Sequence, residues 1–436
     1  MKWLNKMKST VLIGSVSLLA LTTAACGNST DNGAAQGTEK ITLTMMHPWT
    51  SPNVDNEVYK QRIAAFEKEH PNIVIEQDGV PAAQYKTKLR TLAAANNLAD
   101  INVVWPGADL QPIASGGLLE PIDSEMDAWK NILPEDALAG FALDGKQYAV
   151  PTKQTFVDIV YYNKEMFASV GYDHFPATYD EFIDAVKKLK AAGVTPFSLG
   201  NKEKWPLQSS YLSALTERFV GSDFLNKVLS GEAKFTDPQF VKALGVVEEL
   251  TKLDAFNTDA NNMDSVQAQD YFIQGKAAMH VSSSTVDSRI RIENKEGDKF
   301  GIALFPSMPG GNGDAAKSAG VVQYGIAVKS GLDEQKKQAA FEFMKYFVNE
   351  DLYKELISKG VVVPAKVDIP ADASPYLKEM IELTSKGTSP VFDSIIPTQV
   401  VDVMQNGLQA MTVGRTTPEE LAKEVQEALD RKLGGK

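Results

Sequence analysis

Short strand patterns alternate with amphipathic helix patterns through the first part of the chain. Residues 41–45 switch strictly between apolar and polar side chains, which predicts a strand. An amphipathic helix pattern follows, and the same order repeats through strands predicted at 73–75 and 101–105. Strands that alternate with helices are typical of a parallel or mixed sheet with helices on both faces. The pattern therefore predicts an α/β fold.

The middle of the chain contains a strand that runs directly into a helix. Residues 157–167 are rich in β-branched and aromatic side chains and predict this pair of elements. Thr178, followed by Glu181 three positions later, predicts a capping box at the start of another helix. Further strands are predicted within 275–285, 301–306 and 323–328, and mostly helix is predicted after 333.

The first 25 residues have the features of a bacterial export signal. Lysines at positions 2, 6 and 8 precede the apolar run 11–21, and small residues lead to Cys26, the only cysteine of the chain. We predict that 1–25 is a lipoprotein signal peptide and that Cys26 carries the lipid, which would anchor the protein to the cell membrane on its extracytoplasmic side. A plain secretory signal is the alternative. Residues 26–38 are almost free of apolar side chains and predict a flexible tether.

Composition limits the classes of partner. A hydrophobic content of 43% in 436 residues allows two or three globular domains. The net charge of −12 disfavours binding to nucleic acid by charge alone.

The sequence lacks the common signatures of catalysis and metal binding. It contains no G-x-S-x-G, H-E-x-x-H or Walker A motif. Its four histidines are scattered, and no two have the spacing of helical metal ligands. The missing motifs argue against a motif-bearing hydrolase or ATPase, and the scattered histidines predict no metal site.

Three tryptophans in predicted loops are candidates for a sugar site. Trp49, Trp105 and Trp205 have polar neighbours, and a sugar combines apolar C–H faces, which stack on aromatic rings, with hydroxyl groups that need polar partners. We expect at least one of the three to contact a ligand.

Several segments in the same order resemble a known family. Residues 161–167, 176–182, 272–279 and 414–420 are similar to the extracellular solute-binding proteins of carbohydrate ABC importers, the family of maltose-binding protein. The resemblance implies a two-lobed periplasmic-binding-protein-like α/β fold with crossing hinge strands and a cleft between the lobes. It also implies a monomer without cofactor that hands its ligand to the transmembrane permease subunits of the importer.

Lobe boundaries and site residues follow from this resemblance. We expect an N-lobe of 39–152 plus 279–328 and a C-lobe of 153–278 plus 329–436, with the first crossing just before the 157–167 stretch. Serines replace a Gly-x-Trp segment common in the family, which suggests a ligand held more by hydrogen bonds or a sugar of a different shape. The expected ligand-binding residues are Trp49, Trp105, Asp109, Gln154, Asn201, Trp205, Ser283, Ser284 and Tyr324.

Two other functions remain open on the sequence. Members of the same family that bind glycerophosphodiesters also have serines at this point, and a phosphate could be bound by Lys153, Lys202, Arg289 or Arg291. A secreted enzyme that acts on glycosides is the alternative from a different class.

Overall fold

The computed structural model describes residues 40–286, 290, 299–371, 373 and 375–434. The predicted signal peptide, Cys26 and the tether 26–38 lie outside this range, as do Arg289 and Arg291. No helix of the described part is long and apolar enough to cross a membrane.

The first lobe is built on a mixed sheet in the strand order β12-β11-β3-β1-β2, with β6 also paired to β11. β1 is parallel to β2 and β3, whereas β11 is antiparallel to β3 and β6. The expected strands near 41, 73 and 101 are confirmed. The strands are β1 (Ile41–His47), β2 (Ile73–Gly79), β3 (Ile101–Val104), β6 (Ala149–Phe156), β11 (Ser318–Val328) and β12 (Thr388–Ser389).

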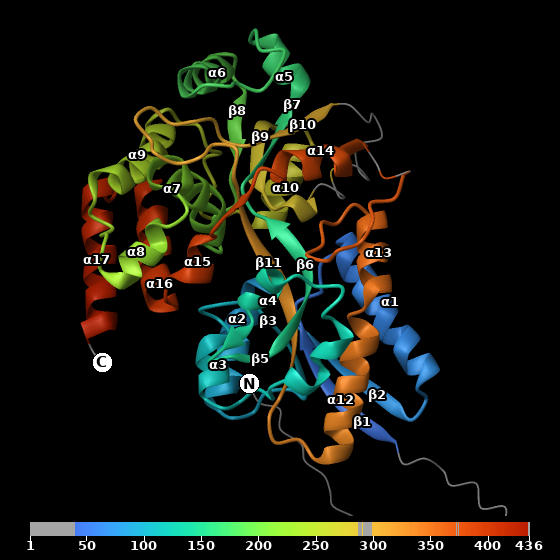
Figure 1. Cartoon of the computed structure of the whole chain (residues 1–436). Coiled ribbons are helices and arrows are strands. Elements are labelled where there is room, and N and C mark those ends of the chain that lie inside the picture. Colours follow the sequence, from blue (N-terminus) through green and yellow to red (C-terminus); the bar gives the residue numbers. More distant parts are fainter. Residues whose placement is uncertain (1–39, 287–289, 291–298, 372, 374, 435–436) are drawn as a thin grey trace, which may run out of the picture. The chain divides into compact units, whose positions relative to one another are not determined.

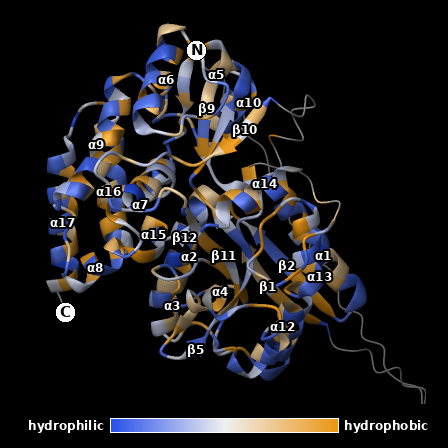
Figure 2. Cartoon of the chain, turned by 45° about the horizontal axis from the view of Figure 1, so that its top comes forward, coloured by the Kyte–Doolittle hydropathy of each residue, from blue (hydrophilic) through white to orange (hydrophobic). Residues whose placement is uncertain are grey.

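Helices cover both faces of this sheet. In Figures 1 and 2, α1, α12 and α13 lie together on one side, and α2 and α3 lie on the other. The helices are α1 (Val54–Glu69), α2 (Ala82–Ala94), α3 (Gln111–Ser115), the 3-10 helix η1 (Asp123–Ala128), α4 (Glu135–Ala139), α12 (Glu334–Phe347) and α13 (Glu350–Ser358). A short hairpin pairs β4 (Ala142–Leu143) with β5 (Lys146–Gln147).

The second lobe contains a separate sheet in the order β10-β7-β9-β8. The predicted strand and helix of the 157–167 stretch are confirmed as β7 and α5, and the Asn163 side chain caps α5 by accepting from the Met166 N–H at 3.1 Å. The strands are β7 (Ile159–Asn163), β8 (Thr195–Ser198), β9 (Ala277–Ser282) and β10 (Phe300–Ala303).

Helices surround the second sheet, with apolar strands inside and hydrophilic helix faces outside (Figure 2). The capping box of Thr178 and Glu181 is present at the start of α6, as predicted. The helices are α5 (Lys164–Ser169), α6 (Tyr179–Ala191), the π-helix η2 (Pro206–Leu212), α7 (Ser213–Val220), α8 (Phe224–Ser230), α9 (Pro238–Lys252), α10 (Ser265–Ile273), the 3-10 helix η3 (Ser284–Val286), α14 (Pro375–Thr384), α15 (Phe392–Ile395), α16 (Thr398–Met411) and α17 (Pro418–Gly434).

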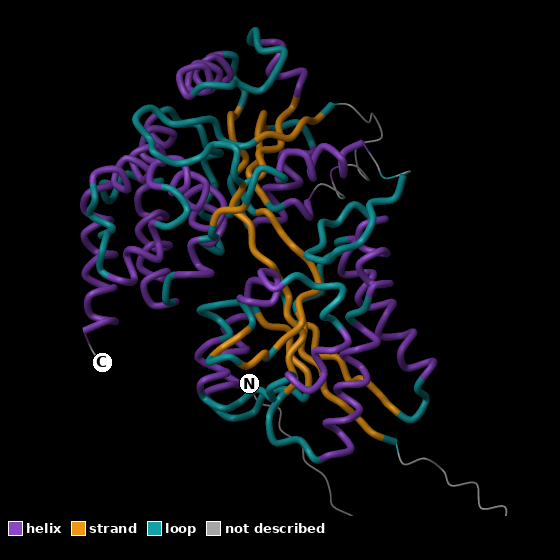
Figure 3. The backbone as a smooth tube through the Cα atoms, in the orientation of Figure 1, coloured by secondary structure: helices purple, strands orange, loops and turns teal. Residues whose placement is uncertain are grey.

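Two long paired strands, β6 and β11, connect the sheets (Figure 3). β6 belongs to the first sheet, and the chain enters β7 of the second sheet two residues after β6 ends. Asp158 lies in this short link and accepts a hydrogen bond of 2.5 Å from the Ser318 hydroxyl at the start of β11. Both crossings are therefore tied together at one point.

The predicted lobe boundaries need two corrections. Most of β9 and all of β10 fall in 279–328, which we assigned to the N-lobe, but both strands pair with β7 in the second sheet. α12 and α13 fall in 329–436, which we assigned to the C-lobe, but they pack on the first: Phe343 contacts Phe66 of α1 edge to face at 5.1 Å. Sequence periodicity shows that a segment is a strand or a helix, but not which sheet it joins.

Candidate functional site

The carboxyl end of β3 presents a half-buried aromatic ring. Trp105 directly follows the last residue of β3 and is partly exposed. The ring of Tyr324 from β11 meets it edge to face, with centroids 5.1 Å apart. The ammonium of Lys86 from α2 lies 5.1 Å from the Trp105 ring centroid. Ligands of α/β sheets gather at such strand ends.

Lys86 is held by carboxylates from two distant parts of the chain. Its Nζ lies 2.7 Å from Oδ2 of Asp109 and 3.5 Å from Oδ2 of Asp393. Burial lowers the pKa of Lys86, but the two carboxylates outweigh it and the pKa is raised above its ordinary value. Lys86 therefore stays charged.

Asp393 reaches this place from α15 of the second lobe. Its Oδ1 accepts from the Ser209 hydroxyl at 2.8 Å and from Nε2 of Gln208 at 3.5 Å, both on the π-helix η2. Gln405 of α16 in turn donates to Oε1 of Gln208 at 3.0 Å. π-helical turns are rare and frequently occur at functional sites.

Residues of both lobes thus form one group of polar and aromatic side chains, which we call the Lys86 cluster. The backbone N–H of Ala108 also faces the carbonyl oxygen of Ser394 at 3.5 Å beside it. The cluster consists of Lys86, Trp105, Asp109 and Tyr324 from the first lobe and Gln208, Ser209 and Asp393 from the second.

Tyr324 has an unusual backbone. Its φ of 58° lies in the left-handed region, which is uncommon for a bulky residue and often marks functional sites. Lys153 places its ammonium 4.4 Å from the centroid of the Tyr324 ring and forms a buried ion pair with Asp55. Burial lowers the pKa of Lys153, but Asp55 and Tyr324 together outweigh burial, so the pKa is raised. This ion pair therefore packs against the Tyr324 ring.

Three of the predicted ligand-binding residues meet in the cluster: Trp105, Asp109 and Tyr324. Trp205 is half-buried and directly precedes η2, which carries Gln208 and Ser209. Gln154 is half-buried on the crossing strand β6, and its backbone N–H donates to the carbonyl of Val362.

Other predicted residues are engaged within the fold. Trp49 is fully buried, and its ring stacks between His47 and Phe347 at 4.8 and 5.5 Å, so neither face is free to stack on a ligand. Asn201 is also fully buried and bonds to Asn261 and to the N–H of Leu207. Neither residue exposes surface to a ligand in this structure, and the candidate site is built without them.

The two serines after β9 have partners of their own. Buried Ser284 accepts from the N–H of Phe156 at 3.2 Å, which fastens β6 to this turn. The hydroxyl of Ser283 bonds to that of Thr285 at 2.7 Å. Ser284 therefore has a structural contact with the end of β6, whereas the Ser283 hydroxyl is bonded within its own turn.

Sequence reasoning missed Lys86, Asp393, Gln208 and Ser209. Lys86 and Asp393 are 307 positions apart, and neither belongs to a recognisable motif. Only the folded chain brings them together.

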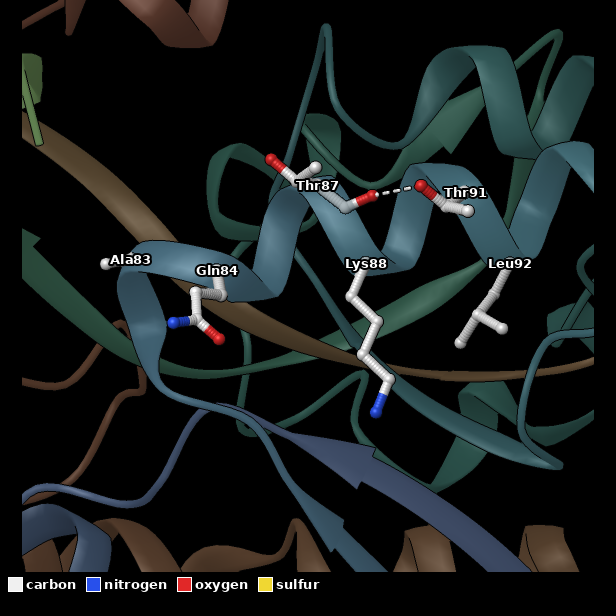
Figure 4. Close-up of a pocket in the computed structure, with 6 residues that line it drawn as sticks. All are labelled: Ala83, Gln84, Thr87, Lys88, Thr91 and Leu92. Carbon is white, nitrogen blue, oxygen red and sulfur yellow. Dashed lines mark hydrogen bonds between the residues drawn. The ribbon is translucent and has the colours of Figure 1, made fainter. Parts of the chain in front are cut away.

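Two hollows of the surface lie outside the Lys86 cluster. One of about 410 Å³ is lined by a single helix, α2, through Ala83, Gln84, Thr87, Lys88, Thr91 and Leu92 (Figure 4). Another of about 700 Å³ lies along α16 and α17. Neither is lined by a predicted site residue. Within the described ranges, no group of three or more His, Cys, Asp or Glu residues could hold a metal ion.

Comparisons with known proteins agree with this architecture. The family model described as bacterial extracellular solute-binding protein matches residues 61–380. The chain is 27% identical over 355 residues to the multiple sugar-binding protein of Streptococcus mutans, covering 79% of each chain.

Two solved structures are similar over nearly all of the described part. A chitin oligosaccharide binding protein has a TM-score of 0.84 and 26% identity, covering 90% of this chain and 98% of its own. A protein from a study of xylan utilization by Caldanaerobius polysaccharolyticus has a TM-score of 0.81 and 27% identity, with coverages of 89% and 99%.

Proposed function

The chain belongs to the bacterial extracellular solute-binding proteins, and we propose that it captures a carbohydrate between its two lobes for an ABC importer. The Lys86 cluster is the observation that carries this proposal. It offers the half-buried ring of Trp105 together with carboxylate, amide and hydroxyl groups from both lobes. This is the chemistry that a sugar needs, because its C–H face stacks and its hydroxyls bond.

The arrangement of the cluster also supports capture by closure. A ligand that contacts both lobes favours the state in which the lobes approach each other. β6 and β11 are the connections about which such a hinge motion would occur. We infer that the closed, loaded protein delivers its ligand to the transmembrane permease subunits, and that it acts as a monomer and not as an enzyme.

The sequence before residue 40 supports a lipid anchor. We propose that Cys26 is acylated after removal of residues 1–25, so that the tether 26–38 holds the receptor at the outer side of the cell membrane. Expression of Cys26→Ser in a bacterial host should release the protein from the membrane fraction. Retention of this variant in the membrane would contradict the anchor.

The test of the binding function is calorimetry of the mature chain with mono- and oligosaccharides. For a sugar that binds, Trp105→Ala should weaken affinity at least tenfold, about 1.4 kcal/mol, because stacking area is lost. Tyr172→Ala is the matched control. It removes a half-buried ring whose partners are Asp184 and Lys188 of α6, and it should leave affinity unchanged.

Other outcomes would decide for the rivals. Binding of glycerophosphodiesters without binding of any sugar would replace the carbohydrate proposal. Sustained hydrolysis of a glycoside, abolished by replacing one carboxylate, would establish an enzyme instead. Unchanged affinity of Trp105→Ala would remove this ring from the site.

A further inference from the structure

The charges of the Lys86 cluster do not balance. One ammonium, Lys86, is shared between two carboxylates, Asp109 and Asp393. The side chains of Asp109 and Asp393 are 12% and 22% exposed, so they are shielded from bulk water and still accessible. The cluster therefore carries one excess negative charge at a place where screening by water is weak.

Nearby ammonium groups cannot supply the missing positive charge. Lys153 lies against Tyr324, but it is buried and paired with Asp55. Lys88, two positions from Lys86 on α2, pairs with Asp78 at 2.6 Å on the surface. In the described part of the chain, each of these ammonium groups already has its own carboxylate.

The donors around Asp393 position its carboxylate without neutralising it. Ser209 and Gln208 are neutral, and both donate to Oδ1. Both groups are nearly or completely buried, at 5% and 0% exposure, so the second lobe holds them rigidly. Among the residues that the structure describes, Lys86 is the partner of Oδ2. A hydroxyl or ammonium hydrogen of a ligand can therefore approach this oxygen, whereas an anionic oxygen is repelled.

We propose that the Lys86 cluster selects its ligand by charge, accepting neutral or amino-bearing saccharides and rejecting acidic ones. Asp393 is the specificity-determining residue, because it adds the second carboxylate and comes from the lobe opposite to Lys86 and Asp109. The inference rests on the proposed function and specifies its substrate class. It also separates the sugar proposal from a phosphodiester ligand, since a phosphodiester carries a negative charge.

The experiment is calorimetry of the mature chain with saccharide pairs that differ in charge. Tri-N-acetylchitotriose and its deacetylated form compare a neutral with a cationic skeleton. Xylotriose and xylotriose substituted with glucuronic acid compare a neutral with an acidic one, and glycerophosphoglycerol, which carries one negative charge and no cation, tests the phosphodiester. We expect the acidic xylotriose to bind at least about tenfold more weakly than xylotriose, and the deacetylated chitotriose to bind at least as tightly as the acetylated one.

The variant Asp393→Asn then tests the role of Asp393 in charge selection. The amide keeps an oxygen for Ser209 but removes the excess charge, so the ratio between neutral and acidic xylotriose should fall several-fold. Asp402→Asn, an exposed change on α16, is the matched control and should leave the ratio as in the natural chain. Equal loss of neutral and acidic binding in Asp393→Asn would show a positioning role only and overturn charge selection.

The outcomes distinguish a failure of charge selection from a failure of the proposed function. Tighter binding of the acidic saccharide overturns charge selection but leaves a carbohydrate receptor. Binding of glycerophosphoglycerol alone overturns both. Failure of every saccharide to bind overturns the proposed function and its substrate class together.

Discussion

His280 is a buried imidazole whose protonation should account for part of the pH dependence of the unfolding free energy. It lies on β9 with 4% exposure, and its Nδ1 is 3.1 Å from the Ser198 carbonyl oxygen. Burial lowers its pKa from 6.5 to about 4. Between these values the unfolded chain binds the proton and the folded chain does not, so stability is complete above pH 6.5 and is lost as the pH falls toward 4.

The predicted loss is about 3 kcal/mol of unfolding free energy from this group alone. His280→Asn keeps a donor for the Ser198 carbonyl but cannot titrate, so urea unfolding of this variant between pH 7 and pH 4 should lose less stability than the natural chain. His174→Asn, a change at an exposed loop position, should reproduce the natural profile. Parallel profiles of the natural chain and His280→Asn would refute this role of His280.

At the scale of elements, two helical glycines should respond to alanine in opposite directions. Gly245 of α9 has open space where a Cβ would stand, whereas a Cβ on Gly407 of α16 would lie 1.9 Å from Cδ1 of Leu421 on α17. Alanine favours helix over glycine by about 1 kcal/mol, so Gly245→Ala should raise the unfolding free energy by nearly that amount.

Gly407→Ala gains the same helix propensity, but Leu421 is fully buried and has to move. Overpacking of a core costs about 1–3 kcal/mol, so the net effect should be destabilising. Denaturant unfolding of both variants measures whether each change raises or lowers the unfolding free energy. Stabilisation by both changes would show that Leu421 moves aside at little cost, and that the contact between α16 and α17 accommodates the added methyl group.

The sequence predicted most of the helices and strands, but fewer of the contacts between them. β7, α5 and the capping box of α6 are local patterns, and all are confirmed. The lobe assignment of β9, β10 and α12 was wrong, because pairing partners far apart in the chain decide it.

The same distinction holds for the site. Trp105 and Asp109 became candidates because they follow a strand within a recognisable segment. No local sequence pattern marks Lys86 or Asp393, because only their contact in the folded chain shows that they belong to one site. Trp49 resembled Trp105 in sequence, but the packing of α1 and α12 encloses it.

At the scale of the whole molecule, the two lobes are joined at a hinge and meet again at the Lys86 cluster. At the hinge, Arg218 of α7 donates to the backbone carbonyls of Phe305, Ala315 and Lys317, and its guanidinium lies 3.9 Å from Asp158. This buried group fixes the start of β11 beside the end of β6. Motion between the lobes is therefore expected in the strands themselves and not in the buried anchor.

Gly107 lies where the lobes meet, and a side chain there should interfere with closure. A Cβ on Gly107 would stand 2.3 Å from the carbonyl oxygen of Ser394 on the opposite lobe. Gly107→Ala should therefore weaken sugar binding at least tenfold, because the ligand has to bring together lobes that now collide. Small-angle scattering should show less compaction on sugar addition than in the natural chain.

The change also strains the backbone, since Gly107 has a φ of 63°, and this effect has to be separated from the collision. Gly117 provides the control, because its φ of 69° imposes the same strain while nothing lies within 4 Å of its Cβ position. Gly117→Ala should lose similar stability and keep both affinity and compaction. If the two variants bind sugar equally well, the contact between Gly107 and Ser394 is not part of the loaded state, and closure on the ligand proceeds with the lobes further apart.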